Sequence, residues 1–304
     1  MEFIKTKADQ LALDRGCYYE PKYGQQVIDF AESLFRPQYI DPNEPFVLNP
    51  WQRDYLNGLY NWRNNEGYLR ANRSVLTCGK KNGKSLIDAI VAAHALLIPQ
   101  PGVFSPEIRS FSTAKESAEQ IYWTIATTLV RSEAYKPFIR VPGKAKKANE
   151  IILLDSQLKI IVKRIRDGYP EMSVFKSCAA DMMGQVGKNL SLVIADELSW
   201  WENESTWLEL EHSGCARKSA LIVCSSTASN NVDGVFYRMV EECHGIQQGT
   251  NLDINTHFQL FEPPSDITDA DLGRGEYWKM ANPSLGLPGC QTVEAFRAEY
   301  ERKK

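Results

Sequence analysis

The residues best suited to chemistry lie where an apolar segment meets a lysine-rich turn. The stretch SVLTCGKKNGKSLIDAI, residues 74–90, predicts a strand, a glycine-containing turn and a helix. In phosphate-binding loops of the G-x-x-x-x-G-K-[ST] type, backbone N–H groups converge on phosphate oxygens at a helix N-terminus. Gly83, Lys84 and Ser85 match the end of that pattern, whereas Cys78 stands in place of its first glycine. The turn therefore predicts a site for the phosphates of a nucleotide.

Each polar residue of this turn has a possible role in such a site. Lys84 would reach the β- and γ-phosphates, and the Ser85 hydroxyl would coordinate Mg²⁺. Contacts to the nucleotide are predicted for Gly79, Lys80, Lys81, Asn82, Gly83, Lys84 and Ser85. A lysine-rich surface turn is the alternative for this motif taken alone, because Cys78 departs from the pattern.

A second motif places two carboxylates at the end of an apolar segment. In LSLVIADELSWW, the apolar residues 192–195 precede Asp196 and Glu197. A buried parallel strand would bring Asp196 to the sheet edge, where it could hold the water shell of Mg²⁺ beside the phosphate loop. Glu197 would then orient and deprotonate the attacking water as general base. Alone, the string is equally typical of a strand that ends in a solvated acidic pair, but the phosphate loop favours the catalytic interpretation.

A third motif, ALIVCSSTASNN, predicts a strand that ends in small hydroxyl residues. Ser226 and Thr227, with their neighbours Ser225 and Ser229, would lie at the same sheet edge and respond to the γ-phosphate. A strand end followed by turn-forming serines is the alternative.

Strand-like and helical segments alternate in the order that a parallel sheet requires. The predicted strands cover residues 73–78, 108–113, 174–178, 191–195 and 220–225, and INTHFQLF predicts one more. The predicted helices between them cover residues 84–97, 114–131, 204–213 and 233–244. EIILLDSQLKIIVKRI predicts an antiparallel hairpin added to the sheet. The fold class is therefore α/β, with a mostly parallel central sheet flanked by helices.

Changes in composition divide the chain into three regions. Residues 1–63 carry helical patterns at 24–35 and 50–63 and predict an all-helical N-terminal segment. Residues 64–262 hold the alternating strands and helices and predict the sheet domain. Residues 263–304 begin rich in Pro, Gly and Asp and predict a linker or the start of another domain.

The overall composition restricts the class of protein. The chain has 304 residues, of which 43% are hydrophobic, enough for a substantial core. Its net charge of -3 gives no general attraction to nucleic acid, so contacts with DNA would need local basic patches. Seven scattered cysteines without a C-x-x-C pair argue against zinc sites and a disulfide framework. No segment resembles a signal peptide or a membrane span, which favours a soluble protein of a reducing cytoplasm.

Several motifs together resemble the large subunit of tailed-bacteriophage terminases, the motor that packages DNA into capsids. They are WQRD at 51–54, GKKNGKS at 79–85, AKESAEQI at 114–121, VIADELSWW at 193–201, CSSTAS at 224–229 and WKMANPSLG at 278–286. By this likeness Gln52, with Arg53 beside it, reads the adenine. The likeness also makes Ser226 and Thr227 the motif that couples hydrolysis to movement. It implies a P-loop ATPase with ATP and Mg²⁺ as cofactors.

The resemblance also implies a function and a set of partners. Such an enzyme hydrolyses ATP to translocate double-stranded DNA into the procapsid. It would form a homo-oligomeric ring on the portal protein, with the small terminase subunit as a partner and no membrane, in the cytoplasm of the infected bacterium. Two other functions stay open: a helicase-type ATPase of superfamily 2, which would need a second RecA-like domain, and a nucleotide-binding scaffold that does not hydrolyse.

Basic residues outside the motifs are candidates for the arginine that completes a neighbouring subunit's site, or for DNA contacts. These residues are Lys144, Lys146, Lys147, Arg164 and Arg166, with the two arginines on one face of a strand. A solvated basic face is the alternative for each.

DNA cleavage is not expected from this chain. Terminase large subunits carry a C-terminal nuclease of ribonuclease H type, which needs carboxylates from several strands around two metal ions. The acidic residues near the C-terminus lie among prolines and glycines instead: Glu262, Asp266, Asp269, Asp271 and Glu276. The nuclease is therefore expected beyond the last residue.

Overall fold

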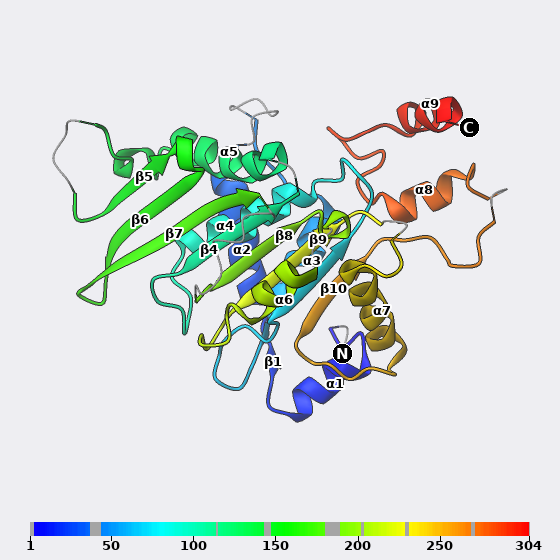
Figure 1. Cartoon of the computed structure of the whole chain (residues 1–304), viewed down its shortest axis with the longest axis horizontal. Helices are drawn as coiled ribbons and strands as arrows, with labels where there is room; N and C mark the ends of the chain where they lie inside the picture. The colour runs from blue at the N-terminus through cyan, green and yellow to red at the C-terminus, as the bar shows by residue number, and fades with distance from the viewer. Residues whose placement is uncertain are drawn as a thin grey trace.

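The centre of the molecule is an eight-stranded sheet (Figure 1). The structure is a computed structural model that describes residues 3–36, 44–113, 115–142, 147–179, 189–201, 204–228, 231–268 and 271–303. The strands of the sheet are β3 (Arg73–Thr77), β4 (Glu107–Ser112), β5 (Glu150–Leu154), β6 (Lys159–Arg166), β7 (Tyr169–Ala179), β8 (Leu192–Asp196), β9 (Leu221–Ser226) and β10 (Thr256–Leu260). Their order across the sheet is β10, β3, β9, β8, β4, β7, β6, β5.

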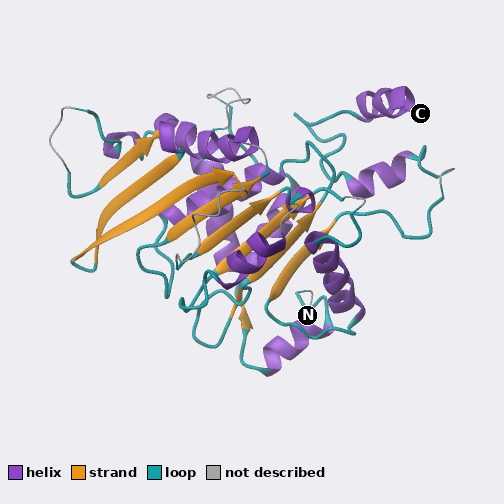
Figure 2. Cartoon of the chain, in the orientation of Figure 1, coloured by secondary structure: helices purple, strands orange, loops and turns teal. Residues whose placement is uncertain are grey.

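The sheet is parallel except at one edge. Strands β10 through β7 of that order pair in parallel, whereas β6 pairs antiparallel with β7 and β5 pairs antiparallel with β6. The predicted hairpin is confirmed, with a short 3-10 turn at Asp155–Gln157 between β5 and β6. Figure 2 shows the central arrows pointing the same way. The predicted fold class, α/β with a mostly parallel sheet, is confirmed.

Helices cover both faces of this sheet (Figure 1). One face packs against α2 (Pro21–Leu34), α3 (Pro50–Tyr60), α4 (Lys84–Leu97) and α5 (Lys115–Arg131), and the other against α6 (Glu204–His212) and α7 (Val235–Gln248). Successive residues of a strand point to opposite faces. Accordingly Leu76 joins the core under α4, whereas its neighbour Val75 packs with Phe236 and Met239.

The apolar runs of the sequence reflect this double coverage. All residues of β8 are buried. A strand covered on both faces has no solvent side, so its sequence is continuously apolar until it reaches the carboxyl edge. Asp196 is the last residue of β8 and the point where the polar site begins.

The N-terminal segment is not all helical, so that part of the prediction is wrong. Besides α1 (Lys7–Asp14), α2 and α3, it contains a small antiparallel pair formed by β1 (Tyr18–Tyr19) and β2 (Trp62–Arg63). Tyr18 pairs with Arg63 and Tyr19 with Trp62. A strand of two residues is too short to show a period in sequence, so only tertiary pairing reveals it.

In the part of the chain that the structure describes, two helices follow residue 262, in the region whose composition predicts a linker. They are α8 (Gly275–Ala281) and α9 (Val293–Lys303). The end of α8 contacts the sheet domain, because the backbone N–H of Gly79 donates to the carbonyl of Ala281 over 2.8 Å. The division of the chain at residue 263 stays a prediction.

Candidate nucleotide-binding site

Three neighbouring parallel strands bring the sequence motifs to one edge of the sheet. The phosphate loop follows β3, the acidic pair ends β8, and the hydroxyl residues end β9. Strand β9 pairs with both others, so that Thr77 lies opposite Ser226 and Asp196 opposite Ser225. Since the carboxyl ends of parallel strands share an edge, residues far apart in sequence become neighbours.

The loop between β3 and α4 has the geometry of a closed turn around a lysine. The Lys84 ammonium donates to the carbonyl oxygens of Cys78, at 2.9 Å, and Gly79, at 3.1 Å. Lys84 is buried although it carries a charge, so these carbonyls replace its water shell. Gly83 has a φ of 97°, a conformation that favours glycine, and is the N-cap residue directly before α4.

Cys78 does not disturb this turn. Among the described residues, the positive-φ positions of the loop are Lys81 and Gly83, and Cys78 is not one of them. The position therefore does not require glycine, and the residue serves the loop through its carbonyl. Burial raises the pKa of its thiol to about 12, so the side chain is a neutral packing group.

Asp196 is surrounded by hydroxyl groups from the loop and from two strands. Its Oδ2 lies 3.5 Å from the Ser85 hydroxyl and 3.5 Å from that of Ser112, and its Oδ1 lies 3.3 Å from that of Ser225. A carboxylate and a hydroxyl are ligands that suit Mg²⁺, which keeps several of its waters in such sites. Within the described residues, no group of three or more His, Cys, Asp or Glu side chains could hold a metal ion.

The electrostatics of the edge are set by burial and crowded charge. Burial, followed by the nearby Glu197 carboxylate, raises the pKa of Asp196 to about 6, while Lys84 opposes the shift. Perturbed carboxyl groups of this kind are common at functional sites.

Glu197 contacts the third motif. Its Oε2 accepts from the backbone N–H and the hydroxyl of Thr227, at 3.4 and 3.3 Å, and lies 3.5 Å from the Ser226 hydroxyl. Its φ is 52°, a left-handed conformation that is costly for a residue with a Cβ and is often found at active sites. The predicted general base and the predicted coupling motif are thus directly hydrogen-bonded.

Asp88 is a member of this site that sequence reasoning missed. It lies on α4, one turn after Lys84, and is fully buried. The Ser225 hydroxyl donates to Oδ2 of Asp88 over 2.5 Å and also lies 3.3 Å from Oδ1 of Asp196. Oδ1 of Asp88 has no hydrogen-bond partner among the described residues. Burial, and then the Asp196 charge, raise the pKa of Asp88 well above its usual range. A carboxylate in the apolar run SLIDAIVAA is the signal that could have indicated it.

The two residues of the predicted adenine motif, Gln52 and Arg53, make different contacts. Gln52 is buried, and its side chain lies against Gly83. A Cβ built onto Gly83 would lie 2.9 Å from Nε2 of Gln52. Its Oε1 accepts from the backbone N–H of Asn49, which caps α3. Arg53 instead forms an ion pair with Glu32. Gln52 therefore lies beside the loop, whereas the Arg53 guanidinium is used for contacts with α2.

The two other lysines of the loop are exposed. The Lys80 ammonium lies 5.8 Å from the centre of the Trp200 ring, which is itself exposed. Lys81 has a φ of 61°. Of the lysines in the loop, only Lys84 is therefore held by the loop itself.

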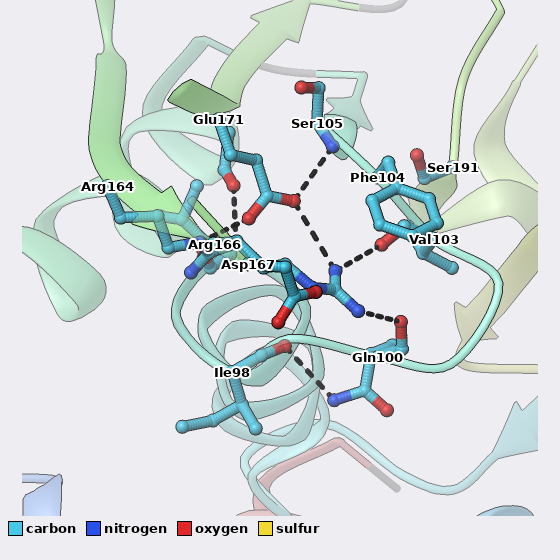
Figure 3. Close-up of polar contacts among 12 residues, drawn as sticks. Ile98, Gln100, Val103, Phe104, Ser105, Arg164, Arg166, Asp167, Glu171 and Ser191 are labelled. Carbon is cyan, nitrogen blue, oxygen red and sulfur yellow. Dashed lines mark hydrogen bonds and ion pairs between the residues drawn. The ribbon is translucent and has the colours of Figure 1, made fainter. Parts of the chain in front are cut away.

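Arg164 and Arg166 do not form a solvated basic face, so that interpretation is wrong. Figure 3 shows both side chains in a polar network with Glu171, near the turn between β6 and β7. Arg164 donates to Glu171 over 2.7 Å and to the carbonyl of Leu97 over 2.8 Å. Arg166 donates to the carbonyl of Val103 over 2.8 Å. Both guanidinium groups are therefore engaged in contacts within this chain.

Other basic and polar candidates have mixed outcomes. The Lys147 ammonium donates to the carbonyl of Pro137. Lys144, Lys146, Ser229 and Asp269 lie outside the described residues.

No helix of the described chain is long and apolar enough to cross a bilayer.

Comparison with known proteins decides the family. The family described as terminase large subunit, ATPase domain, matches residues 50–245, a span that holds Gln52, the phosphate loop, the acidic pair and Thr227. The chain belongs to this family.

Individual proteins resemble this chain to different extents. The large terminase subunit of Enterobacteria phage HK97 is 25% identical over 281 residues, which are 91% of this chain and 49% of that protein. The crystal structure of the HK97 bacteriophage large terminase superposes with a TM-score of 0.68 at 19% identity, over 92% of this chain and 52% of that one. The Thermus phage P74-26 large terminase ATPase domain has a TM-score of 0.47 at 18% identity, over 78% of this chain and 84% of that one. The chain thus spans about half the length of the HK97 terminase.

Proposed function

We propose that this chain is the ATPase motor of a phage DNA-packaging terminase, which hydrolyses ATP to translocate double-stranded DNA into the procapsid. Membership of the terminase large subunit ATPase family supports the reaction class. The observation that carries the proposal is the meeting of Lys84, Ser85, Asp196, Glu197 and Thr227 at one sheet edge. A surface turn or an unrelated acidic strand end would not require this arrangement.

The chemistry follows from what each side chain offers. The N-terminus of α4 and the loop amides would receive the phosphates, and Lys84 would exchange its carbonyl partners for phosphate oxygens. Ser85 and Asp196 would hold Mg²⁺, which offsets charge on the phosphate oxygens when bound. Glu197 would take the proton of the attacking water.

Thr227 provides the link from chemistry to movement. Because it donates to the Glu197 carboxylate that would receive a proton, this contact would change as the reaction proceeds. The end of β9 would then respond to hydrolysis. The same contact would keep Glu197 oriented before the reaction.

The proposed partners are inferred from family membership. We infer a homo-oligomeric ring on the portal protein of the procapsid, supplied with DNA through the small terminase subunit, in the cytoplasm of the infected host. Since Arg164 and Arg166 are used within the chain, a residue from a neighbouring subunit that completes the site would have to be another one.

Phosphate release under steady-state conditions tests the hydrolytic part of the proposal. We expect Mg²⁺-dependent turnover of ATP by the wild-type chain and its loss in Glu197→Gln, which keeps the size of the side chain and removes the base. Binding of ATP without any turnover in the wild type would favour the scaffold function instead. DNA-stimulated turnover together with unwinding of a duplex would favour the helicase function.

A further inference from the structure

The turn that follows α8 lies directly on the phosphate loop. The Gly79 N–H donates to the Ala281 carbonyl over 2.8 Å. A Cβ added to Gly79 would lie 1.9 Å from Oδ1 of Asn282, so any side chain at this position would displace the Asn282 amide. The close approach explains the glycine, which is not needed for a left-handed backbone because its φ is not positive.

Asn82 is the centre of the contact. Its Nδ2 lies within 3.2 Å of three acceptors, the carbonyl oxygens of Gly79 and Lys80 and Oδ1 of Asn282. Its Oδ1 accepts from the backbone N–H of Ser284 over 2.9 Å, and its carbonyl accepts from the Ser284 hydroxyl over 2.9 Å. One loop residue thereby joins both halves of the loop to the turn.

Ser284 extends the network to α3, the helix of the adenine motif. The Trp51 indole N–H donates to the Ser284 hydroxyl over 2.8 Å, and the Asn49 amide lies 3.3 Å from the same oxygen. The next residue of that helix, Gln52, lies against Gly83. Ser284 is 1% exposed, so its bonds are shielded from water and orient the groups strongly.

We propose that Asn282 and Ser284 are positioning residues, which hold the phosphate loop in shape for nucleotide through Asn82. This inference rests on the proposed ATP-binding function. A phosphate loop works only if its amides already converge, and the left-handed Lys81 within it is a conformation that surrounding contacts must maintain. The turn supplies such contacts from a segment 200 residues further along the chain, as the separation of Asn82 and Asn282 shows.

The test is the affinity for a fluorescent ATP analogue with Mg²⁺, measured on the full chain. Ser284→Ala removes the hydroxyl that bonds to Asn82, Trp51 and Asn49, and Asn282→Ala removes the acceptor for Asn82. We expect each to weaken binding about tenfold, or about 1.4 kcal/mol, with Ser284→Thr restoring most of it. Ser265→Ala, at an exposed position before α8, is the matched control and should bind as the wild type does.

A second measurement separates positioning from a general loss of stability. Under steady-state turnover the KM for ATP should rise about tenfold in Ser284→Ala while kcat changes less than about threefold, because Glu197 and Thr227 are untouched. Hydrogen exchange in the peptide that contains Gly79 should quicken in the same variant. If Ser284→Ala does not fold, Asn282→Ala is judged by the same criteria.

The outcomes are distinguishable. A wild-type chain that binds no nucleotide would overturn the proposed function. A wild type that binds normally, with both alanine variants within twofold of it, would overturn the positioning role alone. Reduced thermal stability with unchanged nucleotide affinity would do the same.

Discussion

The hydroxyl of Thr227 lies 3.3 Å from Oε2 of Glu197, the oxygen that also meets the Thr227 backbone N–H at 3.4 Å. Both residues follow strands of the parallel sheet, and the two strands are hydrogen-bonded neighbours. The contact therefore joins two motifs whose residues are thirty positions apart in the sequence.

Replacing Thr227 by valine should slow hydrolysis without preventing nucleotide binding. The change keeps the shape of the side chain and its backbone N–H but removes the hydroxyl donor to Glu197. Hydrogen bonds to a charged group contribute about 1.5–3 kcal/mol, so we expect kcat to fall at least about tenfold. Thr227→Ser is the control that restores the donor. Equal rates in the valine variant and the wild type would contradict the role of this contact.

Lys84→Ala and Glu197→Gln should differ in what they lose. Lys84 neutralises phosphate charge already in the bound ground state, whereas Glu197 acts on water only as the bond breaks. We therefore expect Lys84→Ala to lose ATP binding and Glu197→Gln to keep it while losing turnover. Titration with a fluorescent ATP analogue checks both variants. A comparable loss of affinity in the two would count against the assigned roles.

Acidification should destabilise the chain through buried histidines. Burial lowers the pKa of His94 to about 3, so His94 is neutral in the folded state, whereas its unfolded pKa is near 6.5. The unfolded state then binds the extra proton, and the stability that His94 contributes above pH 6.5 is lost as the pH falls toward 3. Each histidine of this kind should cost about 2 kcal/mol of unfolding free energy between pH 6.5 and 5.

The measurement is urea unfolding at several pH values. His94→Phe should reduce the acid sensitivity, because the ring packs edge-on against Phe30 and Tyr60 and a phenyl ring can take its place. Part of the sensitivity should remain, since burial lowers the pKa of His257 to about 3 as well. The exposed His212, changed to Phe in the same way, should leave the pH dependence unaltered.

Removing Arg164 should reduce stability and leave nucleotide binding unchanged. Its side chain is 14% exposed and pairs with the Glu171 side chain, which is 5% exposed. Taking away one partner of a buried pair typically costs about 3–5 kcal/mol. We expect Arg164→Met to lower the unfolding free energy by that order, and Arg140→Met, at an exposed position, to have little effect. A stable Arg164→Met variant with defective turnover only in assembled rings would instead restore Arg164 as a residue that acts on a neighbour.

Local signals in the sequence were enough to predict the central elements of the fold. The predicted helix 84–97 coincides with α4, because Gly83 and Lys84 mark its start and its apolar face continues to Leu97. The strands that end at Asp196 and Ser226 are apolar runs that end in polar residues, so their ends can be recognised in the sequence. Parallel pairing then brings these ends together, which is why the motifs could be assigned to one edge.

What the sequence could not predict depends on contacts between distant residues. Asp88 interrupts an apolar helix without any pattern that pairs it with Ser225. The turn at Asn282 has the Pro- and Gly-rich composition of a linker, and only its fit against Gly79 reveals its place. The sequence around Arg164 indicates an exposed strand residue, and only the antiparallel pairing of β6 with β7 brings Glu171 opposite it.

The pairing of β8 and β9 has a consequence for how the protein can vary. Asp196 lies opposite Ser225, and both point toward Asp88 on α4. Side chains along a strand alternate between faces, so one residue inserted before Cys224 would turn this cysteine toward Asp88 and carry Ser225 to the opposite face. A thiol is a weak donor and would leave two buried carboxyl groups without their shared hydroxyl. In related chains, substitutions within these two strands should therefore be tolerated far more often than insertions or deletions.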